Sequence, residues 1–432
     1  SCKRVAITQI NTGASEHMIE KEHDTTPQRP HRPIVWGNVA FLTLTPLAAA
    51  IAVPWYVLTH GITWVEIAAC VFMWLLTGLS ITAGYHRLFT HRSYSAPAPV
   101  RAFFAILGAA TFENSVISWA AAHRFHHRHV DTDNDPYNAQ EGFFYSHMGW
   151  VMVEGAKHDD TSNVPDLWKD PILRWQHRHA MVIGAVVNIV TTIILGLITG
   201  HMLGMFVFAF LLRMVLTHHF TFLINSAAHI WGSQPYSTAH SARDNWFLSF
   251  LSFGEGYHNY HHSFQADYRN GPRLYNWDPS KWLIWSLQKM GLATGLKRSP
   301  LDVTLGKLFE HARATFEQRL ASIGETVDEW QVSFGETVDD WQATTLDQTA
   351  AAREALREHV VAAEKRCEEA LAELKIARAD LQAKISEGAG VIGRSRLRRQ
   401  LREATRSARH ALDTWQELGA AYLEGTQVSL SS

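Results

Sequence analysis

The residues of this sequence that could carry chemistry are histidines, and they gather in short clusters. Residues 123–129 read HRFHHRH, and residues 258–262 read HNYHH. On a helix, positions i, i+3 and i+4 lie on one face, so each H-x-x-H-H segment presents three imidazoles in one direction. Clustered imidazoles repel one another when protonated, whereas neutral imidazole is a common metal ligand. The two segments therefore predict metal binding.

Two further pairs of candidate ligands follow directly after long apolar runs. Asn225 and His229, in the segment NSAAH, stand four residues apart and share a helix face. His86 and His91, in HRLFTH, stand five residues apart and can reach one site only near a helix end or a distortion. The two H-x-x-H-H patterns and these two pairs together supply nine histidines: His86, His91, His123, His126, His127, His229, His258, His261 and His262.

Nine imidazoles exceed what one first-row metal ion accepts, so the pattern favours two ions with four or five nitrogen ligands each. Imidazole binds iron, copper, zinc and nickel alike. A structural zinc site needs only four ligands, often thiolates, and this chain has three widely spaced cysteines: Cys2, Cys70 and Cys367. A nitrogen-rich pair of iron ions instead indicates oxygen chemistry. Other clustered histidines are interpreted as packing or interfacial residues: His177, His179, His218 and His219.

The elements that must position these histidines are apolar helices. A bilayer-spanning helix takes about 20 residues, and four apolar runs are that long: 34–58, 64–84, 181–200 and 203–224. The alternative is that these four runs form buried helices in the core of a large soluble protein. The loops within each pair of runs lack Lys and Arg, so the positive-inside rule predicts that every histidine segment lies on the cytosolic face. Arg213, within the fourth run, is expected to point into the bundle.

The sequence resembles the integral-membrane acyl-CoA desaturases of the stearoyl-CoA type over about residues 34 to 295. The segments that carry the resemblance are GLSITAGYHRLFTHRSYSA, WAAAHRFHHRHVDTDNDPYN, GFFYSHMGW, NSAAHIWG and GEGYHNYHHSFQADYR. The resemblance implies an all-α fold, with four transmembrane helices under a cytosolic helical cap that carries a non-haem di-iron site. The nine histidines match the iron ligands of the family, and Asn225 matches an asparagine that reaches one iron through water.

The activity implied is O2-dependent insertion of a cis double bond into a saturated acyl chain that is carried by CoA, with the double bond at the delta-9 position. Its two electrons would come from an external donor of the ferredoxin, rubredoxin or cytochrome b5 type with a reductase. The G-x-G-x-x-G match at residues 388–393 lies in a charged helical region and is interpreted as an interhelical turn. A related histidine-rich hydroxylase or alkane oxygenase is the nearest alternative. A non-catalytic membrane scaffold acting through its C-terminal coiled coil is the second.

The resemblance also implies substrate contacts: Asn38, Trp74, Gly78, Asn114, Trp119, Thr221 and Phe222. Two departures concern the carrier of the acyl chain. Ala121 and Ala122 stand where animal members have Arg-Asp, and Glu154 and Gly155 stand where they have a basic pair. Because those family residues contact CoA, the carrier stays open between CoA, another thioester and a phospholipid.

Residues outside the 34–295 region form a polar N-terminal tail (1–33) and a charged extension (301–432). In the extension, GETVDEWQ recurs as GETVDDWQ eleven residues later, which places Trp330 and Trp341 on one helical stripe. Apolar residues then step by four and three along two seams, from Val360 to Leu381 and from Leu397 to Trp415. These seams predict a helical hairpin or coiled coil.

Charge is segregated along the same extension. Residues 394–409 include seven arginines and one glutamate, whereas residues 320–352 contain no Lys or Arg. The extension is therefore expected to dock to itself, to a second copy or to the membrane surface, where anionic lipids would attract the arginines. Nucleic-acid binding is not expected, because the net charge of the chain is −2 and no basic recognition motif occurs.

Overall fold

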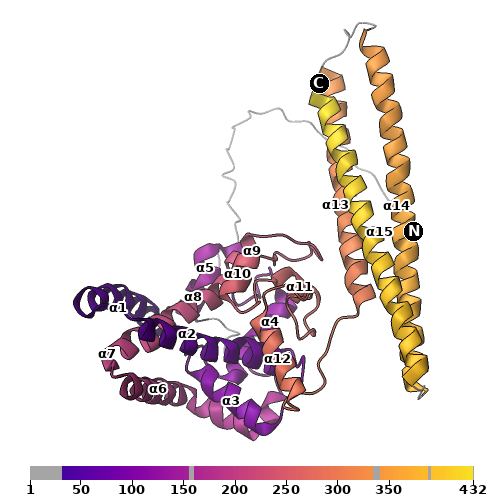
Figure 1. Ribbon diagram of the computed structural model, residues 1–432. Coiled ribbons are helices and arrows are strands. Elements are labelled where there is room, and N and C mark those ends of the chain that lie inside the picture. The colour runs from indigo at the N-terminus through magenta and orange to yellow at the C-terminus, as the bar shows by residue number, and fades with distance from the viewer. Residues whose placement is uncertain (1–31, 155–159, 334–340, 388–390, 432) are drawn as a thin grey trace, which may run out of the picture.

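The computed structural model describes residues 32–154, 160–333, 341–387 and 391–431, and every regular element within these ranges is a helix (Figure 1). Four helical stretches are long and apolar enough to cross a membrane, as the sequence predicts. They are α1 (Trp36–His60), α2 (Trp64–Leu79) with η1 (Ser80–Thr90), α6 (Pro171–Thr199), and α7 (Met202–Gly204) with η5 (Met205–Leu212), α8 (Arg213–Asn225) and α9 (Ala227–Ile230).

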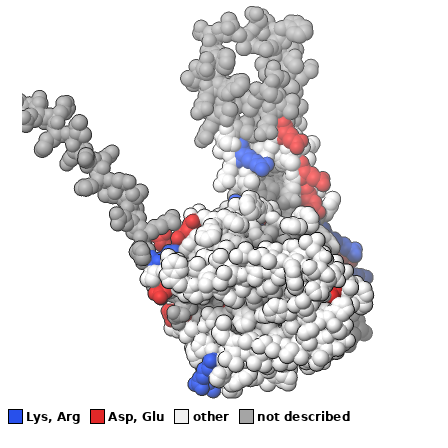
Figure 2. Space-filling view, turned by 90° about the vertical axis from the view of Figure 1, so that its left-hand side faces the viewer, with Lys and Arg blue, Asp and Glu red and all other residues white. Residues whose placement is uncertain are grey.

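The outer surfaces of these helices are apolar. Leu58 on α1 is 85% exposed, and Ile198 on α6 is 76% exposed. Figure 2 views the side of the molecule on which α1 and α7 lie, and this broad face carries few Lys, Arg, Asp or Glu side chains. Exposed aliphatic side chains are unfavourable in water but not in hydrocarbon, so the surface fits a lipid environment.

The second and fourth stretches each contain a π-helix, η1 and η5. In η1 the amide of His91 donates to the carbonyl of His86 at 3.0 Å, five residues earlier. The wider π-helical turn brings residues five apart towards one side, and such segments are frequent at functional sites. The expected distortion between His86 and His91 is therefore a π-helix.

The third stretch begins earlier than the apolar run predicts. Asp170 caps α6 by accepting from the amide of Ile172 at 2.9 Å, and Pro171 occupies the first turn, where its missing N–H costs nothing. The backbone of His179 leaves helical geometry at φ −123°. The ten residues before the run therefore form a helical extension that meets the membrane helix at this kink.

Two buried polar groups hold the four stretches together. Arg213 is fully buried and donates to the carbonyls of Ala110 and Ala209 and to the side chain of Asn188, so it does point into the bundle. The second group is Glu66, near the loop that joins the first two stretches. Glu66 accepts from Tyr56 Oη at 3.0 Å and lies 2.5 Å from Nδ1 of His201, in the loop that joins the last two. These bonds link the two hairpins, because Glu66 and His201 belong to different ones.

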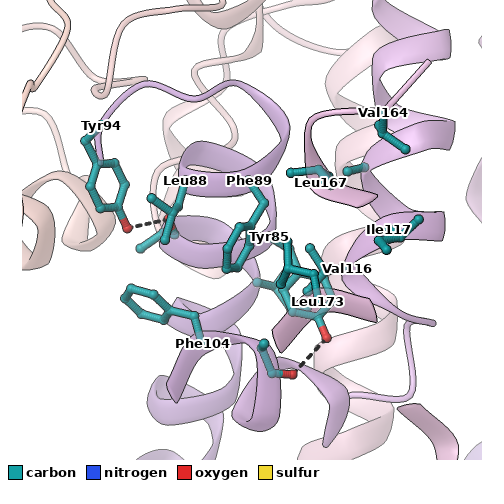
Figure 3. Packing of buried hydrophobic residues seen from close by; sticks show 14 of the residues in the cluster. Tyr85, Leu88, Phe89, Tyr94, Phe104, Val116, Ile117, Val164, Leu167 and Leu173 are labelled. Carbon is teal, nitrogen blue, oxygen red and sulfur yellow. Dashed lines mark hydrogen bonds between the residues drawn. The ribbon is translucent and has the colours of Figure 1, made fainter. Parts of the chain in front are cut away.

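The cap is built from shorter helices. They are α3 (Ala98–Ala109), α4 (Val116–His129), η2 (Ala139–Glu141), α5 (Phe143–His147), η3 (Gly149–Met152), η4 (Leu167–Lys169), α10 (Trp246–Leu251), α11 (His258–Ser263) and α12 (Pro279–Lys289). Of these helices, α3, α4 and α12 pack on η1. Figure 3 shows buried side chains of η1, α3 and α4 converging, with Tyr94 Oη donating to Ala83 O at 2.8 Å. This core fixes η1 against α4, and hence their histidines against each other.

The C-terminal extension forms three long helices, α13 (Leu301–Ser333), α14 (Trp341–Ser386) and α15 (Val391–Ser431). Their core contains the predicted seams: Val360, Ala363, Cys367, Ala370, Leu374, Ala408, Leu412 and Trp415 are buried together, with Leu401 and Ala404 packed against them. Helix α14 ends at Ser386 and α15 begins at Val391, and residues 388–390 of the predicted glycine turn lie outside the described residues. The side chains of the eleven-residue repeat lie outside the described residues.

Candidate metal centre and acyl pocket

The nine predicted histidines come together in two groups. His86, His91, His123, His127 and His261 form the first, and His126, His229, His258 and His262 form the second. Within each group the candidate ligand nitrogens all lie within 4.8 Å of one another. The histidines come from η1, its C-terminal end, α4, α9 and α11, so separate elements converge on one place. Neither the 177–179 pair nor the 218–219 pair belongs to a group.

The spacing of the ring nitrogens fits coordination of metal ions. In the first group, Nε2 atoms of neighbouring rings lie 2.9–3.0 Å apart, and in the second 3.1–3.3 Å apart. Two nitrogens bound about 2.1 Å from one ion lie about 3.0 Å apart at right angles and about 3.4 Å apart at the tetrahedral angle. The separations in the structure, 2.9–3.3 Å, fall within this interval or at its lower edge.

Hydrogen bonding between the rings cannot satisfy this arrangement. His261 Nε2 lies 3.0 Å from His86 Nε2 and 2.9 Å from His127 Nε2. A neutral imidazole nitrogen either donates one proton or accepts with one lone pair, so it bonds well to one neighbour only. In addition, His91 Nε2 is buried without a hydrogen-bond partner among the described residues. An ion that accepts every lone pair at once would satisfy these atoms.

Carboxylates and hydroxyls hold several of the rings from behind. Glu255 Oε2 lies 2.8 Å from His86 Nδ1, and Asp135 Oδ1 lies 2.8 Å from His126 Nδ1. Ser241 Oγ lies 2.7 Å from His229 Nδ1, and Tyr137 Oη lies 3.1 Å from His123 Nδ1. Acceptors at Nδ1 orient a ring so that Nε2 presents its lone pair, which is the usual arrangement behind a metal-bound histidine.

Buried charges support this outer layer. Arg87 is fully buried and donates to both Glu255 and Asp278 at 2.9 Å. The Arg87 guanidinium helps to hold the pKa of the Glu255 carboxyl below its usual value, against the effect of burial. Glu255 therefore remains a charged acceptor behind His86. Asp131 plays a similar part, because its carboxylate accepts from the amide and the hydroxyl of Ser241.

Six histidines of the two groups, all outside the membrane stretches, are held in their neutral form. Burial, reinforced by neighbouring imidazoles, lowers the pKa well below 6.5 for a set of six residues: His91, His123, His127, His258, His261 and His262. The neutral ring is the form that binds a metal. At neutral pH these rings therefore need no deprotonation before they act as ligands.

A cavity of about 1250 Å³ adjoins the histidine groups. Single small-molecule pockets usually measure about 300–1,000 Å³, so this one suits a long ligand. His86, His123 and His258 lie in its wall, as does Asn225. All seven residues predicted to contact substrate also line it: Asn38, Trp74, Gly78, Asn114, Trp119, Thr221 and Phe222.

Glu113 is a carboxyl group of the cavity wall that sequence patterns do not single out. Glu113 accepts from Thr221 Oγ1 at 3.0 Å and from Trp119 Nε1 at 3.4 Å, so it links two of the predicted contact residues. Burial raises the pKa of Glu113 from 4.5 to about 7. A neutral carboxyl is far less costly beside an apolar ligand than a charged one.

Three aromatic rings pack together in the cavity wall. Trp74 packs between Phe253 and Phe220, with ring centroids 4.6 and 5.8 Å away. Phe253 also fills the space beside Gly78, where an added Cβ would lie 2.2 Å from its ring. Phe253 therefore occupies the space that a side chain at position 78 would need.

Comparison with known proteins agrees with this geometry. A family model described as fatty acid desaturase matches residues 62–277. The chain belongs to the fatty acid desaturase family. It is 38% identical over 280 residues to stearoyl-CoA desaturase 5 of Bos taurus, which covers 63% of this chain and 82% of that protein. It is 36% identical over 273 residues to delta(9)-fatty-acid desaturase fat-7 of Caenorhabditis elegans, covering 60% and 78%.

The match to a fungal family member is similar in identity but covers less of the relative. The chain is 36% identical over 298 residues to acyl-CoA desaturase 1 of Saccharomyces cerevisiae, 68% of this chain. This match spans 58% of the yeast protein's own length. The family match ends at residue 277, so the helices α13 to α15 lie outside it.

Some residues that support the site of this desaturase-family chain carry a weak signal in the sequence, and others carry none. Glu255 stands three residues before His258 in GEGYH, and Asp135 follows the first histidine cluster in DNDP. Both could be suspected as acidic neighbours of histidines, but their ring contacts are visible only in three dimensions. Ser241 and Glu113 carry no pattern, because a lone Ser or Glu in a loop is ordinary.

Proposed function

We propose that this protein is an O2-dependent fatty acyl desaturase that introduces a cis double bond into a saturated acyl chain. The observation that carries the proposal is the contact between the two histidine groups and the long cavity. His86, His123 and His258 belong both to the groups and to the cavity wall. A chain lying in the cavity would pass directly beside the histidines.

The nine histidines would hold two iron ions, with Asn225 placed to reach one of them through water. Iron supplies the oxidising power that breaks an unactivated C–H bond with O2. The overall change balances as one saturated acyl chain, O2, two electrons and two protons giving one cis-unsaturated chain and two waters. The chain's own residues bind and orient the substrate, which fixes the carbon pair that reacts.

A bend in the bound acyl chain would define the reacting carbons. Thr221, Glu113 and Trp119 are linked by hydrogen bonds and line the same cavity as three of the histidines and Trp74. A saturated chain held against this wall would bend there, and a cis double bond preserves such a bend. Orientation of this kind accounts for a large part of catalysis in enzymes whose cofactor carries the hard step.

The finer assignment is acyl-CoA as substrate and delta-9 as position, supported by the names of the relatives. The bilayer would be crossed four times, with both termini and the histidine groups on the cytosolic side, as the charge of the loops predicts. Residues 34–295 would form the desaturase domain and residues 301–432 a helical extension capable of self-association. Electrons would come from an external ferredoxin, rubredoxin or cytochrome b5 with its reductase.

The decisive experiment is lipid analysis of cells that lack their own desaturase and express this chain. We expect a new cis double bond, located by gas chromatography and mass spectrometry. A hydroxylated product of the same chain would instead support the alternative of a histidine-rich hydroxylase. Unchanged lipids, with the protein folded and loaded with iron, would contradict the proposal and favour a scaffold that acts through its C-terminal helices.

A further inference from the structure

The C-terminal bundle rests directly on the short helix that carries three of the histidines. Lys307 Nζ on α13 lies 3.4 Å from Ser263 O, at the end of α11, and Leu308 packs against Tyr260 and Phe264. Figure 1 places the bundle on the side of the cap opposite the ends of α1 and α7. The bundle is therefore separated from the membrane helices by the cap, and it faces water.

One imidazole connects the second histidine group to the edge of this bundle. The ring centroid of His240 lies 5.1 Å from that of His262, and neither ring nitrogen of His240 has a hydrogen-bond partner among the described residues. Gln234 Nε2 donates to His240 O at 2.6 Å. Gln234 itself lines a groove of about 320 Å³ between the loop at Ser233 and helices α13 and α15.

The arginine-rich start of α15 leads along the helix to the same groove. Arg402, Arg406 and Arg409 are exposed, and on this stretch the only ion pair within the described residues is a loose one, Arg399 to Glu403 at 3.7 Å. Helical periodicity places the three arginines on one outward stripe. The stripe continues past Asp413 to Gln416 and Ala420, which line the groove.

We propose that this arginine stripe and the adjoining groove dock a small acidic protein that carries one electron at a time, with His240 on the electron's path to the histidine groups. The inference rests on the proposed desaturase function, whose reaction consumes two electrons. Two carrier molecules would each be oxidised by one electron, and these electrons would enter the balance that ends in two waters. Charge complementarity steers such short-lived encounters and mainly sets their association rate.

The test compares two sets of three charge reversals in the full-length, iron-loaded protein. R402E/R406E/R409E changes the stripe, and K365E/R366E/K375E changes exposed cations of α14 as a matched control. The probes are a purified acidic [2Fe–2S] ferredoxin and the soluble domain of cytochrome b5, each kept reduced by its reductase. We expect the stripe variant to lose at least about tenfold in kcat/KM for the carrier at low salt. The loss should disappear at high salt, and the control should match the wild type.

Turnover driven by a small chemical reductant separates this inference from the proposed function. Both variants should then desaturate as fast as the wild type. If the wild type makes no double bond with the chemical reductant, the proposed function has failed. If it does, and the stripe variant uses both carriers normally, the docking surface is wrong. A stripe variant that loses only binding to phosphatidylglycerol vesicles, or only self-association, would also overturn it.

The role of His240 needs a readout that a loss of folding would not imitate. In a preformed complex with saturating carrier, the first-order oxidation of the carrier is followed by stopped-flow absorbance. We expect His240→Ala to slow this step several-fold with iron content unchanged, and His240→Phe, which keeps a ring against His262, to retain it. Equal rates in the wild type and in His240→Ala would remove His240 from the path.

Discussion

Chain-length preference is the property that this structure makes most directly testable, through the contact between Gly78 and Phe253. An added Cβ at Gly78 would lie 2.2 Å from Phe253 Cε2, whereas carbon atoms in contact lie about 3.5–4.0 Å apart. The ring must therefore move by roughly 1.5 Å. Phe253 lines the cavity, so the free space into which it can move is the acyl path itself.

The expected change follows from the length of an acyl chain. An extended chain advances about 1.25 Å per carbon, so Gly78→Ala should shorten the best substrate by roughly one carbon. Gly78→Leu should shorten it by about three or four carbons on the same scale. Overpacking of this kind also costs about 1–3 kcal/mol of stability, so expression and melting temperature are measured alongside.

The opposite change should come from the aromatic rings that close the path. Trp74→Ala removes the indole that packs on Phe253, and it should lengthen the accepted chain by roughly two to four carbons. Product profiles on saturated 14- to 20-carbon substrates, analysed by gas chromatography, measure both shifts. The double variant G78A/F253A is the control, because removing the ring should cancel the effect of the added methyl.

Two results would refute this reasoning. Unchanged profiles in both Gly78→Leu and Trp74→Ala would mean that the second membrane helix does not close the path. A double variant that remains as restricted as Gly78→Ala would mean that Phe253 is not the group displaced.

Four further outcomes are expected. Purified protein should contain about two iron ions per chain, and His126→Ala or His261→Ala should lose metal and turnover while the membrane bundle stays folded, as size-exclusion chromatography would report. Purified chain with NADPH, O2 and substrate should be inert until a reductase and carrier are added; turnover without them would contradict this. The pKa of Glu113 is raised to about 7, so kcat/KM should fall between pH 6.5 and 8.5 in the wild type and stay flat in Glu113→Gln. Because the carboxyl pKa of Glu113 is raised above 4.5, the folded protein loses stability as the pH rises from 4.5 to 7. At pH 8 the free energy of unfolding of Glu113→Gln should therefore exceed that of the wild type, by at most about 3 kcal/mol.

The membrane helices and the candidate ligands could be predicted because each depends on local sequence. A span needs only a long apolar run, and H-x-x-H-H needs only one helical turn to present its rings. The spacing of His86 and His91 predicts a helix end or a distortion, but it does not predict that the distortion is a π-helix. Its register depends on packing that includes residues far away in sequence, such as Leu173, Tyr268 and Ile284.

The support behind the rings could not be predicted, because it comes from distant segments. Ser241 reaches His229 from a loop that Asp131 holds, more than a hundred residues away. Likewise Phe253 occupies the space beside Gly78 only because the turn after α10 folds back onto α2. Its backbone there is left-handed, with φ 56°, which a non-glycine residue adopts only when the surrounding structure demands it.

The histidine groups also bear on why the cap folds as it does. The Nε2 atoms crowd one another, and Nε2 of His91 is buried without a hydrogen-bond partner among the described residues. Each buried nitrogen left without a partner costs about 1–3 kcal/mol, which is a large fraction of the net stability of a typical domain, about 5–15 kcal/mol. Metal binding to η1, α4, α9 and α11 would offset this cost, so the site that performs the chemistry would also join the elements that carry it.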